Sequence, residues 1–121
     1  MKNKFKLVLI TSLFILALGP QAVVFSQGLN SNELIKNAKQ YDGKLITYSG
    51  EIIGDVMSRG EFAWVNINDG DNAFGVWMSA GLVKEINFTG TYKSRGDVLE
   101  ITGIFHRACL EHGGDLDIHA Q

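Results

Sequence analysis

Apolar and polar positions alternate along most of the chain after residue 43, which predicts a domain built mainly from β-strands. Two glycines, Gly50 and Gly54, interrupt the first alternating run, so we expect that strand to bend. A helical pattern with polar residues at its start precedes the strands at Ser31–Gln40. The predicted strands are Lys44–Val56, Glu61–Asn68, Ala73–Ser79, a short Ile86–Tyr92, Asp97–Phe105 and Asp115–Ala120.

Turn-forming sequences separate these strands. The strongest is Asn68–Asn72, whose Asn-Asp-Gly-Asp-Asn sequence predicts a tight hairpin. We expect His106–Gly114 to be a loop, in which Gly113 and Gly114 allow the backbone to reverse sharply. Five or six short strands, a long bent first strand and one helix are typical of a small closed barrel. The predicted fold class is therefore all-β, a five-stranded barrel with a short N-terminal helix.

The first 26 residues have the pattern of a targeting segment. Three lysines precede the nearly uninterrupted apolar run Leu7–Leu18, and Gly19 and Pro20 then break it. Small residues at positions 24 and 26 predict a signal-peptidase cut before Gln27. The alternative is an uncleaved anchor over residues 7–25, which would be the only membrane contact. Both alternatives place the predicted domain, residues 27–121, outside the cytoplasm.

The charge of residues 27–121 disfavours nucleic acid as a ligand. The targeting segment takes three of the 11 basic residues and none of the 13 acidic ones, so eight basic residues remain and the net charge is −5. A surface that follows a phosphate backbone usually carries a basic stripe, and the remaining basic residues are scattered along the sequence.

Several short motifs together resemble a known family. They are Tyr41–Lys44, Gly50–Asp55, Trp64–Asn66, Asn68–Gly70 and Gly96–Gly103. This pattern, spread over about residues 41–120, resembles bacterial OB-fold proteins of the tRNA-anti-like, nucleic-acid-binding type, in particular exported or membrane-anchored members. The resemblance implies a five-stranded OB-type barrel whose second and third strands present a ligand face. It also implies nucleic acid as the default ligand, which the charge and the expected location disfavour.

All three histidines and the only cysteine lie within 14 residues near the end of the chain. A turn after His112 would bring the last strand back beside His106, and imidazole and thiolate are ligands that suit Zn²⁺ or, as a competitor, copper. The predicted metal ligands are His106, Cys109, His112 and His119, with Asp117 as a further ligand or as a partner that fixes a histidine tautomer.

Two other interpretations of this segment stay open. In one, the hairpin is merely polar, its aspartates are solvated, and Cys109 packs as a small apolar side chain. In the other, Cys109 is a thiol nucleophile assisted by His112, although nothing in the sequence orients a base or forms an oxyanion hole. A lone cysteine in an exported protein is also able to bridge two chains.

A second candidate surface is aromatic. Phe62, Trp64 and Asn66 share one face of the predicted second strand, and Trp77 lies on the third strand. The opposite faces of both strands are wholly apolar and are expected to form the core, so the aromatic face points outward. Its rings could stack on nucleobases or sugars, with room left by Gly75. The alternative is that both tryptophans pack under the N-terminal helix or under the connector after the third strand.

These patterns together predict an exported OB-fold ligand-binding module and not an enzyme. The favoured ligand is a Zn or Cu ion at the closing hairpin, with the aromatic face as a separate contact surface. The alternatives are nucleic-acid or oligosaccharide binding on the aromatic face, and a structural adaptor that binds an unknown partner in a cell-envelope complex.

Overall fold

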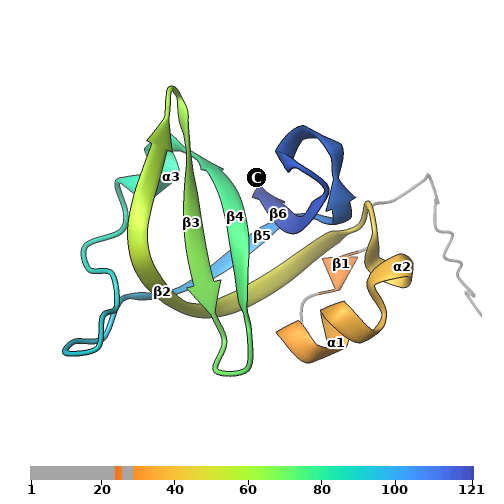
Figure 1. The fold of residues 1–121 in the computed structure, drawn as a ribbon, viewed down its shortest axis with the longest axis horizontal. Helices are drawn as coiled ribbons and strands as arrows, with labels where there is room; N and C mark the ends of the chain where they lie inside the picture. The colour runs from red at the N-terminus through yellow and green to blue at the C-terminus, as the bar shows by residue number, and fades with distance from the viewer. Residues whose placement is uncertain (1–23, 26–28) are drawn as a thin grey trace, which may run out of the picture.

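Five strands of the chain close into a ring (Figure 1). The computed structural model describes Val24–Phe25 and residues 29–121; the predicted targeting segment, residues 1–26, otherwise lies outside the described residues. The sheet order is β1-β2-β3-β4-β6-β5, and β5 pairs again with β2. The elements are β1 (Val24–Phe25), α1 (Ser31–Lys36), α2 (Ala38–Tyr41), β2 (Leu45–Arg59), β3 (Phe62–Asn68), β4 (Ala73–Ser79), α3 (Ala80–Val83), β5 (Val98–Cys109), the 3₁₀ helix η1 (Leu110–His112) and β6 (Asp115–Ala120). This arrangement confirms the predicted all-β fold with short N-terminal helices, although the ring is less regular than an ideal barrel.

The long strand β2 belongs to both sides of the ring. Its first half, from Leu45 to Glu51, pairs with β5, and its second half pairs with β3. The register with β3 shifts between Ile53 and Met57, where Gly54 has a φ of +72°. A residue with a side chain rarely adopts that conformation, so glycine permits the bend that the sequence predicts.

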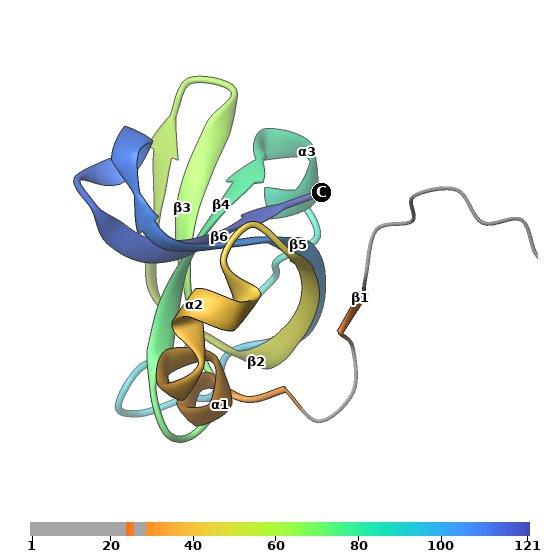
Figure 2. The same ribbon diagram turned by 90° about the vertical axis from the view of Figure 1, so that its right-hand side faces the viewer.

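The core fills the inside of the ring. On β3 and β4 every second residue is buried, as the alternation predicts. Each such side chain contributes about 1.5–3 kcal/mol when it is fully buried. Leu34 of α1 is also fully buried and belongs to this core, and α1 and α2 lie toward the viewer in Figure 2. The core cluster consists of Leu34, Tyr41, Ile46, Tyr48, Ile52, Val65, Ile67, Phe74, Val76, Met78, Ile101, Phe105 and Ile118.

The predicted single helix Ser31–Gln40 is two short helices separated at Asn37, whose backbone is not helical. The first helix is fixed to the turn between β3 and β4 by Asp69, which accepts hydrogen bonds from the backbone N–H of Ser31 (2.6 Å) and from its hydroxyl (2.7 Å). Burial tends to raise the pKa of Asp69, but these bonds and those from the N–H groups of Asn72 and Asp71 outweigh it and lower the pKa.

One predicted strand is absent and two predicted strands end too early. Ile86–Tyr92 is not a strand, because only Gly90 forms a bridge, to Ile53, and the carboxylate of Asp97 accepts the N–H groups near its start instead. Strand β2 continues past Val56 to Arg59. Strand β5 continues past Phe105 to Cys109, because β6 offers it pairing partners beyond the expected end. Within the described part of the chain, no helix is both long and apolar enough to cross a membrane.

Candidate metal centre

The candidate metal ligands lie on the hairpin formed by β5, η1 and β6. The chain reverses at Gly113 and Gly114, which have φ values of +75° and +85°, and the N–H of Gly114 donates to the carbonyl of Cys109 at 2.7 Å. The reversal pairs His106 with Asp117 and Ile104 with His119 across the two strands. The sequence prediction that the glycines return the last strand beside His106 is confirmed.

Asp117 stands at the centre of this hairpin and is 0% exposed. Nδ1 of His106 lies 3.1 Å from its Oδ1, and Nδ1 of His112 lies 2.8 Å from its Oδ2. Nε2 of His119 is 3.4 Å from the same Oδ2. Within the described residues, the ion-pair partners of Asp117 are these three imidazoles and no lysine or arginine.

Cys109 joins the same group from the end of β5. Its Sγ lies 3.4 Å from Nδ1 of His112 and 3.5 Å from Nε2 of His119, and the residue is 3% exposed. Burial, and in addition the hydrogen bond and negative charge of Asp117, raise the pKa of the thiol, although backbone N–H groups of Glu111 and His112 act in the opposite direction. The structure therefore brings all five residues of the predicted metal set together.

The geometry fits four-coordinate binding. His106, Cys109, Asp117 and His119 each offer one ligand atom, and these atoms all lie within 4.8 Å of one another. With zinc–nitrogen and zinc–oxygen bonds of about 2.0–2.2 Å and a zinc–sulfur bond of about 2.3 Å, tetrahedral ligand atoms are about 3.3–3.6 Å apart. The Cys109–His119 separation of 3.5 Å and the His119–Asp117 separation of 3.4 Å fall in that range.

His112 has a different relation to the group. Its 2.8 Å separation from Asp117 is the length of a hydrogen bond and is shorter than a tetrahedral edge. The His106–Asp117 separation of 3.1 Å is also below that range, so the grouping rests on the ligand atoms within 4.8 Å of one another, which include Asp117 and leave out His112. On that grouping Asp117 is a ligand and His112 orients it, whereas the sequence pattern alone made His112 a ligand and left Asp117 between two roles.

The aromatic face adjoins this centre. The ring of His112 lies 4.5 Å from that of Trp64 and 4.8 Å from that of Trp77, between ring centroids. Phe62 stacks on Trp77 at 5.4 Å with an interplanar angle of 13°. The expectation of two separate surfaces is therefore wrong. Parallel pairing places Trp77 of β4 opposite His119 of β6, and antiparallel pairing places Trp64 opposite Trp77, so all these rings share one side of the sheet.

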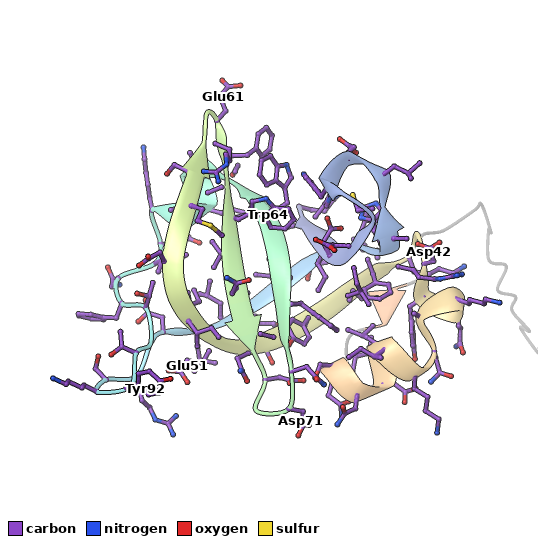
Figure 3. All side chains as sticks on the ribbon, viewed as in Figure 1. Asp42, Glu51, Glu61, Trp64, Asp71 and Tyr92 are labelled. Atoms are coloured by element: carbon purple, nitrogen blue, oxygen red, sulfur yellow. The ribbon has the colours of Figure 1, made fainter. Side chains whose placement is uncertain are left out.

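Gly75 leaves room for the side chain of Trp64. A Cβ at this position would lie 3.0 Å from Cζ3 of Trp64, so the absence of a side chain lets the indole rest on β4. The indole of Trp64 occupies the space beside Gly75 in which a stacked ligand was predicted. Figure 3 shows Trp64 on the side of the sheet that faces the closing hairpin. Both tryptophans are half-buried, and their rings contact each other and His112.

Beside Trp64 runs a groove with a volume of about 490 Å³. Asn66 lies in it, with Ile35 of α1 and Leu116 of β6 on its walls. Of the predicted aromatic face, Trp64 and Asn66 therefore border a cavity, while Phe62 and Trp77 form a stack next to the histidines. Sequence reasoning missed the contact between the tryptophans and His112, because it depends on which strands pair.

Comparison with known proteins supports the fold. No protein-family model matches the chain, and no curated protein matches it. Its fold is similar to that of asparaginyl-tRNA synthetase from Pyrococcus horikoshii, solved with asparaginyl-adenylate, with a TM-score of 0.52 and 16% identity over 76% of this chain and 20% of the synthetase chain. The chain thus spans about a fifth of the length of the synthetase.

Two proteins named OBodies also match. OBody NL8, bound to hen egg-white lysozyme, is 25% identical over 65% of this chain and 89% of its own, with a TM-score of 0.46. OBody AM3L09, also bound to hen egg-white lysozyme, is 19% identical over 84% of this chain and 92% of its own, with a TM-score of 0.48. At these identities the likeness to the synthetase shows an OB-like fold and nothing finer.

Proposed function

We propose that this domain is a binding module, without catalytic activity, that holds one transition-metal ion in its closing hairpin, and that the ion is zinc. The observation that carries the proposal is the convergence of three imidazoles and a thiol on one fully buried carboxylate. His106, Cys109, Asp117 and His119 would hold the ion, and His112 would orient Asp117.

The burial of Asp117 is the first argument. A carboxylate removed from water is costly unless a positive group compensates its charge. In the described part of the chain the ion-pair partners of Asp117 are three imidazoles, and imidazoles are neutral when they act as ligands. A divalent cation would compensate the carboxylate and would bind the imidazoles and the thiolate at the same time.

The mixed ligand set favours zinc over copper. Zinc accepts sulfur, nitrogen and oxygen ligands in one tetrahedral site, whereas a soft cuprous ion gains little from a carboxylate. The separations of 3.5 Å and 3.4 Å that involve His119 match tetrahedral edges. Copper is the competing ion.

Cobalt substitution tests the proposal. Metal-stripped protein is titrated with Co²⁺ and then with Zn²⁺, while visible and near-ultraviolet absorption are recorded. We expect intense tetrahedral d–d bands and a thiolate-to-cobalt charge-transfer band, both saturating at one equivalent and both abolished by excess zinc. Cys109→Ser removes the charge-transfer band. Asp115→Asn is the matched control, because Asp115 lies on the same strand but is exposed. Weak octahedral bands, or no difference between Cys109→Ser and the wild type, would refute the proposal.

We propose further that the domain acts outside the cytoplasm, as an exported member of the tRNA-anti-like OB-fold proteins. The basic and apolar pattern of residues 1–26 supports this location. Cell fractionation of the tagged full-length chain tests it, and recovery in the cytoplasmic fraction would refute it.

The groove beside Trp64 supports a second candidate function, stacking of a nucleobase or sugar ring next to Asn66. Tryptophan emission during titration with single-stranded DNA or oligosaccharides at low salt tests this candidate. Absence of any change would exclude nucleic acid, because low salt maximises the attraction of phosphates.

A further inference from the structure

We propose that the ion at this centre is exchangeable cargo, which the domain receives from or passes to a partner carrying its own thiolate or imidazole ligands. The inference rests on the proposed metal site and adds the role of the ion. The other role open to a metal in so small a domain is to brace the fold. Three features of the described residues favour an exchangeable ion over an ion that stabilises the fold.

The first feature is a core that is complete without the ion. The buried apolar cluster fills the ring, and none of the proposed ligands belongs to it. The strands that carry the ligands are anchored to that cluster independently, β5 through Phe105 and β6 through Ile118, both fully buried. Domains braced by zinc, in contrast, obtain much of their folding free energy from the metal and unfold without it.

The second feature is a centre whose polar groups are partners of one another within the protein. Among the described residues, no buried side-chain nitrogen or oxygen lacks a hydrogen-bond partner. Asp117 accepts bonds from His106 and His112, and Cys109 contacts His112 and His119. Because these groups partner one another, release of an ion would leave no buried polar group of the centre unpaired. Such mutual contacts limit the reorganisation that accompanies exchange of the ion.

The third feature is a difference in exposure across the centre. The side chains of His106 and His119 are 29% and 21% exposed, whereas that of Asp117 is 1% exposed and Cys109 is buried. An incoming ligand therefore reaches the imidazole side first. At each step of transfer, one bond from the partner's ligand to the ion would form and one bond from the ion to this domain would break, first the bonds to His106 and His119 and then the bond to Asp117. The released nitrogen keeps its lone pair, and the ion keeps its oxidation state. Cys109 leaves last and takes up a proton from water.

Chelator exchange tests this role. Zinc-loaded protein is mixed with increasing excess of a chromophoric chelator in a stopped-flow instrument, and thermal unfolding of loaded and stripped protein is followed by circular dichroism. We expect the exchange rate to rise in proportion to chelator concentration, because the chelator attacks the bound ion directly. We also expect stripped protein to keep its spectrum and its cooperative unfolding.

Variants locate the side of attack. His106→Ala removes the most exposed of the ligands and is expected to speed exchange at least about tenfold, whereas the control Asp115→Asn leaves the rate unchanged. An exchange rate independent of chelator and equal to the unfolding rate, loss of cooperative unfolding on stripping, or an unchanged rate in His106→Ala would each overturn the cargo role. If the starting protein binds no zinc, the proposed function itself fails, and the two failures are thus distinguishable.

Discussion

Replacement of Asp117 by asparagine tests the geometry of the hairpin before any metal is added. The carboxylate accepts bonds of 3.1 Å from His106 and 2.8 Å from His112 in a site closed to water. An asparagine of the same shape keeps one acceptor but turns its NH₂ group toward the other imidazole and carries no charge. Hydrogen bonds to a buried charged group contribute about 1.5–3 kcal/mol each, so Asp117→Asn should lower the free energy of unfolding by about 2–4 kcal/mol.

Urea unfolding of metal-stripped protein, followed by circular dichroism, measures this loss. With a urea m value of about 1 kcal/mol/M for a domain of this size, the midpoint should fall by about 2 M or more. Asp115→Asn controls for the chemistry of the substitution, since Asp115 lies on the same face of β6 and is exposed, and it should shift the midpoint little. If both variants unfolded at the same urea concentration, the imidazoles would not be gathered around Asp117, and the metal centre would lose its basis.

Three further outcomes follow from the packing and the charges. Gly75→Ala places a Cβ 3.0 Å from the indole of Trp64 and should lower the free energy of unfolding by about 1–3 kcal/mol. A variant with the thermal stability of the wild type would contradict the packing of that indole against Gly75. Hydrogen bonds hold the pKa of folded Asp69 below its ordinary value despite burial, so the stabilisation they give is present above about pH 4 and is lost as pH falls through the folded pKa. The difference in free energy of unfolding between the wild type and Asp69→Asn should therefore disappear in acid. A difference that did not change with pH would refute this assignment. Because both tryptophans contact His112, Zn²⁺ should change their emission, and His112→Ala should reduce that change.

The local sequence pattern was sufficient to predict the strands that bury one face. In β3 and β4 the alternation has a period of two and one face is wholly apolar, so the sequence determines which face enters the core. The His/Cys segment was also recognisable, because its members are close in sequence and a glycine pair lies between them. These features require no knowledge of which strands pair.

The features that escaped prediction depend on pairing between distant segments. Ile86–Tyr92 alternates as a strand should, yet among residues 29–121 its pairing with a strand is limited to the bridge between Gly90 and Ile53 of β2. The contact of Trp64 and Trp77 with His112 arises because β4 pairs in parallel with β6, in a register that sets Trp77 opposite His119. A shift of one residue would turn every side chain to the opposite face, and nothing local in the sequence specifies that choice.

The register between β4 and β6 thus links the fold to its proposed chemistry. It places the aromatic stack beside the His/Cys centre and sets the fully buried Asp117 on the same face of the sheet as that stack, in register with Gly75. Because Gly75 has no side chain, Trp64 can pack there and cover His112. Substitutions on β3 and β4 should therefore change metal affinity even though those strands supply no ligand.

X-ray absorption at the zinc edge, on protein loaded with one equivalent, tests the metal centre most directly. The arrangement of Cys109 among His106, Asp117 and His119 predicts one sulfur at about 2.3 Å and three nitrogen or oxygen atoms at about 2.0–2.2 Å, with multiple scattering from imidazole rings. A spectrum without sulfur, or with six oxygen or nitrogen neighbours, would show that the ion binds elsewhere and would contradict the proposed site.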